Sequence, residues 1–100
     1  MEFFRKHIEQ IKFLCEKYKV KVLFAFGSVS TNTMNENSDV DLIVDIESSD
    51  PIEYSDNYFE LKSGLKKLFN REIDLLEQRA IRNPFLKQQI DHTKVLLYGK

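Results

Sequence analysis

Two aspartates, Asp39 and Asp41, stand one residue apart where the sequence enters an apolar run at 39–46. That run has the composition of a β-strand, in which carboxylates normally weaken pairing and burial. Because side chains alternate between the two faces of a strand, we expect both carboxylates on one face, about 7 Å apart along the chain. A divalent cation between them offsets their mutual repulsion. The pair therefore predicts a metal site on a rigid strand.

A Gly-Ser pair, Gly27 and Ser28, ends the preceding apolar run, and ten residues separate it from Asp39. A glycine lets a ligand approach the backbone closely. The serine offers a hydroxyl and an N–H at a helix start, which suits phosphate oxygens. Ser28 is also suited to a plain helix N-cap, and the two roles are compatible. We predict that this side of the turn holds the phosphates of a triphosphate and that the aspartates hold its metal.

A third carboxylate, Asp74, lies in the apolar segment 71–77, where the pattern otherwise expects burial. Three carboxylates complete a two-metal site, in which one ion activates an attacking hydroxyl and the other neutralises the leaving phosphates. Glu72 shares a face with Asp74 and is more often a rim charge than a ligand. Asp45 shares the Asp39 face but lies about 13 Å farther up the strand. Asp74 is therefore the preferred third ligand.

The elements that must position these residues follow from the periodicity of the apolar side chains. Helical spacing predicts helices at 2–18 and, as one helix or two, at 51–69, and strand-like patterns predict strands at 19–26, 39–46 and 71–77. A further helix begins after Asn83, and the tail at 94–100 is either a short strand or an irregular segment. This order indicates an α/β (α+β) fold, a small mixed β-sheet with helices packed on one face.

Helix-start signals refine two of these elements. Asp50 precedes a proline and is expected to be an N-cap, with Glu53 three residues later completing a capping box. Asn83 also precedes a proline and predicts the start of the last helix. Gly64 lies inside a helical pattern and predicts close packing against a neighbouring element.

Composition limits the classes of function. The 100 residues predict a single domain, residues 1–100, and the net charge of −1 argues against strong nucleic-acid binding. Residues 36–60 carry nine acids and no base, which suits a cation or a basic partner, although a solvated acidic face is the ordinary meaning of such a run. The single cysteine, Cys15, is expected to be a small core residue. No apolar run is long enough to span a membrane, no signal peptide is visible, and a cytoplasmic protein is expected.

The Gly-Ser pair, the Asp-x-Asp motif and the later aspartate together resemble the signature of the DNA polymerase β-like nucleotidyltransferases. The short length and the layout resemble the minimal nucleotidyltransferase branch of that family. The matching residues are Gly27, Ser28, Ser38, Asp39, Val40, Asp41, Leu42 and Asp74. The positions that often hold Ala-Arg-Gly in the family are Ser30, Thr31 and Asn32 in this chain.

This resemblance implies a role for each site residue. The fold would be that of the polymerase β-like nucleotidyltransferases. Asp39 and Asp41 would bind two Mg²⁺ ions, and Asp74 would bind the catalytic ion and help to deprotonate the nucleophile. Gly27 and Ser28 would hold the β- and γ-phosphates of ATP.

Many proteins of this branch are antitoxins encoded beside a HEPN-domain toxin. The resemblance therefore implies a metal-dependent protein adenylyltransferase that transfers AMP from ATP to a tyrosine of a HEPN-type toxin, within a type VII-like toxin–antitoxin pair. One alternative is a non-catalytic antitoxin that neutralises its partner by binding alone. Another is transfer to a small molecule such as an antibiotic, for which such enzymes usually carry a further substrate domain.

Overall fold

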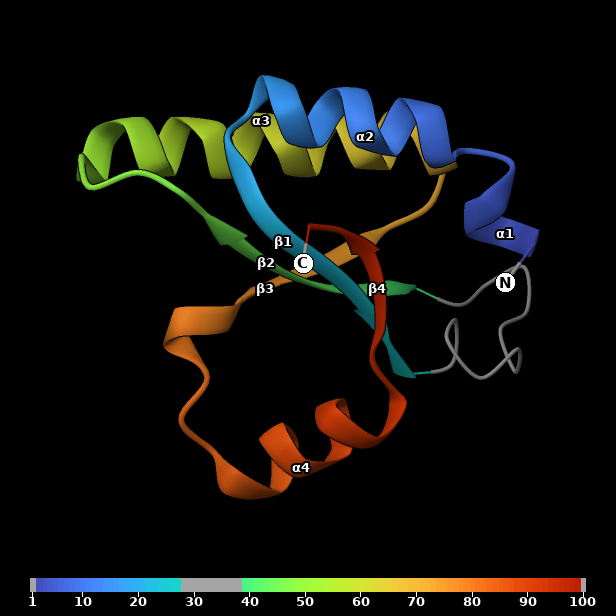
Figure 1. Cartoon of the computed structure of the whole chain (residues 1–100), viewed down its shortest axis with the longest axis vertical. Coiled ribbons are helices and arrows are strands. Elements are labelled where there is room, and N and C mark those ends of the chain that lie inside the picture. The colour runs from blue at the N-terminus through green and yellow to red at the C-terminus, as the bar shows by residue number, and fades with distance from the viewer. Residues whose placement is uncertain (1, 28–38, 100) are drawn as a thin grey trace.

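The computed structural model describes residues 2–27 and 39–99, with side chains described from Phe4 onward. Two helices and two strands are followed by a long helix, a strand, a short 3₁₀ helix, η2, a further helix and a last strand (Figure 1). The elements are α1 (Glu2–Arg5), α2 (Ile8–Lys17), β1 (Val20–Phe26), β2 (Val40–Ile46), α3 (Pro51–Phe69), β3 (Ile73–Glu77), η2 (Gln78–Ala80), α4 (Pro84–Thr93) and β4 (Val95–Tyr98).

The strands form one mixed sheet in the order β3-β2-β1-β4. Strand β1 is antiparallel to both of its neighbours, and β2 and β3 are parallel. Helices α2 and α3 lie side by side over one face of the sheet, and α4 lies on the opposite side (Figure 1). The predicted fold class, a small mixed α/β sheet, is confirmed, with α2 and α3 on one face as expected and α4 on the other. The tail left open between a strand and an irregular segment forms the edge strand β4.

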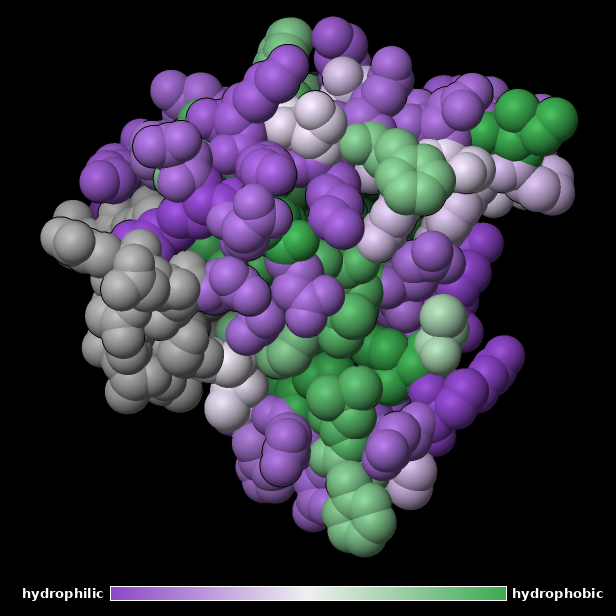
Figure 2. Space-filling view, turned by 180° about the vertical axis from the view of Figure 1, so that it is seen from behind, coloured by the Kyte–Doolittle hydropathy of each residue, from purple (hydrophilic) through white to green (hydrophobic). Residues whose placement is uncertain are grey.

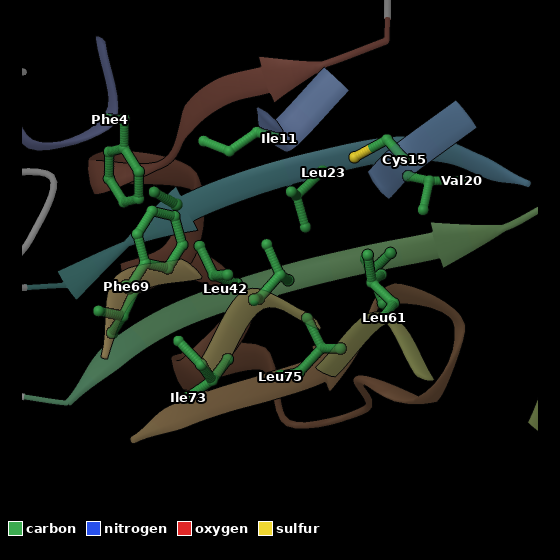
Figure 3. Close-up of a cluster of buried hydrophobic side chains, with 14 of the residues drawn as sticks. Phe4, Ile11, Cys15, Val20, Leu23, Leu42, Leu61, Phe69, Ile73 and Leu75 are labelled. Atoms are coloured by element: carbon green, nitrogen blue, oxygen red, sulfur yellow. The ribbon is translucent and has the colours of Figure 1, made fainter. Parts of the chain in front are cut away.

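The hydrophobic core lies between the sheet and helices α2 and α3, where Leu23, Leu42 and Leu61 point toward one another (Figure 3). Along β2 the side chains at positions 40, 42, 44 and 46 are fully buried, whereas Asp41 and Asp45 are half-buried. Alternation therefore points the even positions into the core and turns the acids to the opposite face. Cys15 is buried as predicted, and its burial raises the pKa of the thiol to about 12.

The single helix expected at 2–18 is wrong, because the chain turns at residues 6–7 between α1 and α2. The His7 N–H donates to the Phe4 carbonyl at 3.0 Å, which closes a tight turn. The Phe4 ring meets the Phe69 ring edge-on, with the ring centres 5.7 Å apart. The contact of Phe4 with the end of α3 thus favours a break between α1 and α2 over one continuous helix. The spacing of apolar residues does not predict such a tertiary contact.

The start of α3 confirms the cap but not the capping box. The Asp50 carboxylate accepts a hydrogen bond from the Ile52 N–H at 2.9 Å, as an N-cap does. The Asp50 N–H, however, donates to Ser48 Oγ, and Glu53 Oε1 accepts from Ser48 Oγ and from Lys19 Nζ. The capping box is therefore wrong, because the Lys19 ammonium and the Ser48 hydroxyl occupy the Glu53 carboxylate. These hydrogen bonds, with that from Lys19 the larger, also lower the pKa of Glu53.

The remaining helix signals agree with the structure. Residues 51–69 form one helix, which ends at Asn70 in the left-handed conformation. The Asn83 side chain accepts hydrogen bonds from two N–H groups at the start of α4. A Cβ on Gly64 would lie 3.0 Å from Leu14 of α2, so the predicted close packing is confirmed. Within the described segments no helix has the length and apolar character to cross a bilayer.

Candidate functional site

Strand pairing brings two of the three predicted carboxylates side by side on the sheet. In the parallel ladder of β2 and β3, Asp41 is the direct partner of Asp74. Neighbouring strands lie about 4.8 Å apart, so residues distant in sequence become adjacent. Asp39 lies just before β2 and shares the face of Asp41 by alternation. The register thus groups the acids on the face opposite the helical core.

The pKa of Asp41 responds to the nearby acids. Its side chain is half-buried, whereas Asp39 and Asp74 are exposed. Burial raises the pKa of the Asp41 carboxyl, and the negative charges of Asp74 and then Asp39 raise it further. Deprotonated Asp41 is therefore a destabilised anion. A cation at this position would relieve both the repulsion and the loss of solvation.

Gly27 ends β1 directly beside Asp41. Its φ of +74° lies in the left-handed region, and a Cβ there would stand 2.8 Å from Asp41 Oδ2. Any larger residue would therefore press on the carboxylate as well as strain the backbone. The Gly27 N–H donates to Thr93 Oγ1 at 3.3 Å, which ties the turn to the end of α4. Ser28 lies outside the described residues.

The carboxylates suit Mg²⁺ as part of a ligand set and not as a closed cage. Among residues 2–27 and 39–99, no three His, Cys, Asp or Glu side chains stand close enough to enclose an ion by themselves. Magnesium prefers oxygen ligands, and it commonly takes one or two carboxylates together with substrate phosphates and waters. Asp39, Asp41 and Asp74 supply such oxygens beside the open side of the Gly27 turn. Their chemistry fits an ion that arrives with a nucleotide.

The other acids considered from the sequence have structural partners. Asp45 pairs with Arg79 at 2.9 Å, and Glu72 pairs with Lys66 at 3.0 Å. Both bonds draw these carboxylates away from a role as shared metal ligands. The choice of Asp74 over Glu72 and Asp45 is consistent with this geometry.

Two residues near the sheet carry structural roles that the sequence analysis missed. Arg79 donates to Asp45 and to the Ile46 carbonyl, and its guanidinium lies 4.5 Å from the centre of the Tyr54 ring. Thr93 was not singled out at all, because a threonine at a helix end has no distinctive sequence signal. Its contact with Gly27 arises only when α4 returns to the sheet.

The aromatic residues of α3 do not form an exposed base-stacking surface. Tyr54 and Tyr58 pack against the core, and the Tyr58 hydroxyl donates to the Leu75 carbonyl. Burial is the main cause that raises the pKa of Tyr54 to about 12, and it also raises the pKa of Tyr58. Phe59 is the exception, because 63% of it is exposed.

Comparison with known proteins finds a matching family model, similar relatives and similar solved structures. The family model described as polymerase beta, nucleotidyltransferase, matches residues 9–100. A Methanocaldococcus jannaschii protein, provisionally named a protein adenylyltransferase, is 36% identical over 90 residues, which cover 90% of this chain and 86% of that protein.

Two solved structures resemble the whole arrangement of helices and strands. One, provisionally described as a minimal nucleotidyltransferase, has a TM-score of 0.76 and 26% identity over 94% of this chain and 92% of its own. The other, a toxin–antitoxin crystal structure with AMP-PNP, has a TM-score of 0.71 and 27% identity over 93% of this chain and 73% of its own.

Proposed function

This chain belongs to the polymerase beta nucleotidyltransferase family, and we propose that it transfers AMP from ATP to a hydroxyl of a partner protein. The single observation that carries the proposal is the pairing of Asp41 with Asp74 beside Gly27. The provisional name of the relative from Methanocaldococcus jannaschii points to the same class of acceptor. Bound AMP-PNP in a similar solved structure supports ATP as the nucleotide.

In this proposal Gly27, with Ser28, binds the β- and γ-phosphates, and Asp39, Asp41 and Asp74 hold two Mg²⁺ ions. The ions, when bound, supply positive charge that lowers the pKa of the attacking hydroxyl and neutralises the leaving group. The chain itself holds the α-phosphate next to the carboxylates of Asp39, Asp41 and Asp74. Orientation of this kind accounts for much of the rate gain in reactions between two bound groups.

Asp74 is the group that receives the proton. The acceptor oxygen forms a bond to the α-phosphorus, the bond from that phosphorus to the bridging oxygen breaks, and pyrophosphate leaves with the bonding electrons. The proton of the acceptor hydroxyl passes to the Asp74 carboxylate. Because Asp74 is exposed while Asp41 is half-buried, it is the carboxylate that an incoming protein side chain reaches more easily.

We propose that the acceptor is a tyrosine of a HEPN-type toxin in a type VII-like toxin–antitoxin pair. A toxin–antitoxin assembly among the similar structures supports this partner class. The acidic stretch 36–60 suits a basic docking surface, and its described members Glu47, Asp50, Asp56 and Glu60 are exposed.

Position-specific labelling tests the reaction class. The purified chain, Mg²⁺ and a HEPN-type toxin are incubated with ATP labelled at either the α- or the γ-phosphate. Nucleotide transfer labels the toxin from α-labelled ATP only, and Asp74→Asn lowers the rate by a factor on the order of a hundred or more. Label from γ-labelled ATP would indicate phosphoryl transfer and would reject the proposal.

A further inference from the structure

A narrow groove lies between α4 and the sheet face that carries Asp41. Its volume is about 180 Å³, and its apolar lining comes from Phe24, Ile43, Ile81 and Ile90. An apolar area extends over the surface between the level of the sheet and α4 (Figure 2). Whole small-molecule ligands usually occupy pockets of about 300–1,000 Å³, so this groove suits one flat ring system and not an entire nucleotide.

The groove lies two ladder positions from the candidate active site. Phe24 pairs with Ile43 in the ladder of β1 and β2, and two positions along the same ladder Phe26 pairs with Asp41. Two residues of strand correspond to about 7 Å and return to the same face. The hydrogen bond from Gly27 to Thr93 joins the phosphate side to the end of α4. If the phosphates of a nucleotide lie at Gly27, its base can therefore reach this groove, because the distance is about one nucleoside length.

The charges at the rim also favour a nucleotide. Two lysines, Lys87 and Lys94, accompany one acid, Asp91, which pairs with Lys94 at 3.2 Å. The Lys94 ammonium lies 4.9 Å from the centre of the Phe24 ring. A larger but shallower depression at the other end of β2 has the opposite balance. Two bases and four acids line it, namely Lys21, Arg79, Asp45, Glu47, Asp50 and Glu53. The excess of acids there repels a polyanionic ligand, whereas the rim of the α4 groove carries no excess of acids.

We propose that the α4 groove holds the nucleobase of the nucleotide whose phosphates lie beside Gly27 and Asp41. The inference rests on the proposed nucleotidyl transfer and adds the subsite that selects the nucleotide. The Phe24 ring and the isoleucine side chains provide an apolar contact for the base. Gln78 also lines the groove, and its side-chain amide offers both a donor and an acceptor to the edge of a base.

Ligand binding with and without a base tests the proposal. The dissociation constants of Mg²⁺–AMP-PNP and of Mg²⁺–tripolyphosphate are measured for the wild type, Phe24→Leu, Ile81→Ala and the control Ile52→Ala. Ile52 is 74% exposed on α3 and lies outside the groove lining. We expect each groove variant to bind AMP-PNP about tenfold more weakly, with the tripolyphosphate constant and the control unchanged. Ile81→Ala, in a half-exposed loop position, keeps the test valid if Phe24→Leu unfolds.

Three outcomes would overturn the groove assignment. These are equal weakening of both ligands, unchanged AMP-PNP binding in both groove variants, and wild-type binding of tripolyphosphate as tight as that of AMP-PNP. If the wild type still transfers nucleotides in any of these cases, the proposed function stands and only the base subsite is lost. Selective AMP-PNP binding without any transfer would reject the proposed function and keep the subsite.

Discussion

The charge on Asp41 links the stability of the protein to its chemistry. Its pKa in the folded chain is raised by burial and by the charges of Asp74 and Asp39. A raised pKa means that the folded state favours the protonated form. The associated stability is present at acidic pH and is lost as the pH rises through the folded pKa. At neutral pH the metal-free protein therefore carries a destabilising anion at its candidate active site.

The first prediction concerns Asp41→Asn. Without metal, this variant is expected to melt at a higher temperature than the wild type at pH 7, and the difference should shrink as the pH falls below the pKa of Asp41. Its transfer rate is expected to fall on the order of a thousandfold, because metal-held charge stabilisation is worth several kcal/mol. Asp56→Asn, at an exposed carboxylate of α3, is the matched control and should change neither quantity. Equal melting temperatures of wild type and Asp41→Asn from pH 4 to 7 would contradict this account of the charge.

The functional role of the acids can be predicted from the sequence, because charged residues are unusual within apolar strands. Asp41 and Asp74 put charge into strands whose neighbours are apolar, and such conflicts between local pattern and residue type point to function. The side-by-side pairing of Asp41 with Asp74 is not visible in the sequence, because strand register depends on tertiary packing. Gly27 was predictable as a turn residue, but its contact with Asp41 Oδ2 was not.

At the scale of elements, α4 positions the Gly27 turn through one hydroxyl. Thr93 donates to the Gln89 carbonyl at 3.0 Å and accepts from the Gly27 N–H. The first bond orients the hydroxyl so that a lone pair faces the glycine. The sequence could not predict this contact, because it joins residues that are distant along the chain and the motif contains only one of them.

Thr93→Val should lower kcat/KM for ATP by a factor of about 2 to 12, since one net hydrogen bond contributes about 0.5–1.5 kcal/mol. Thr93→Ser keeps the acceptor and should retain most of the wild-type kcat/KM. Steady-state kinetics of the two variants separate a positioning role from simple packing. Packing alone would make the serine variant, which lacks the methyl group, the worse of the two.

Arg79 lies in η2, directly after β3, and connects η2 to β2 and α3. It binds Asp45 and the Ile46 carbonyl of β2 and stacks on Tyr54 of α3. The hydrogen bond to Asp45 is the main cause that raises the pKa of Arg79. Its planar, multiply bonded geometry cannot be reproduced by an ammonium group.

Arg79→Lys is therefore expected to lower the free energy of unfolding by about 1 kcal/mol, as lost hydrogen bonds and stacking imply. Urea denaturation measures this change, and Arg82→Lys at a nearby exposed position is the control. If both variants lost the same free energy of unfolding, the effect would be a general one of replacing arginine and not a consequence of the Arg79 contacts with β2 and α3.

For the whole molecule, helices α2 and α3 cover one sheet face and leave the other to the acids and α4. This division was predictable from apolar periodicity, because every second position of β2 from Val40 to Ile46 is apolar and buried, and both acids of β2 lie at the positions between. The break at His7 and the partners of Glu53 were not, since both depend on contacts between separate elements. The core that supports the site can thus be predicted from the sequence, whereas the contacts between separate elements cannot.

Nucleotide and metal should stabilise the whole chain jointly. The protein carboxylates leave coordination positions that the phosphates fill, so each ligand raises the affinity for the other. Thermal denaturation with saturating Mg²⁺, with ATP and with both is expected to give a shift for the pair that exceeds the sum of the separate shifts. Strictly additive shifts would argue against a shared site.

The central claim is that this chain modifies a partner protein and does not merely cover it. Intact-mass spectrometry of a HEPN-type toxin, after incubation with ATP, Mg²⁺ and either wild-type or Asp74→Asn protein, tests that claim most directly. The account predicts whole AMP additions to a toxin tyrosine with the wild type and an unmodified, active toxin with Asp74→Asn. An unmodified toxin that both proteins inhibit equally would contradict the account and favour an antitoxin that acts by binding alone.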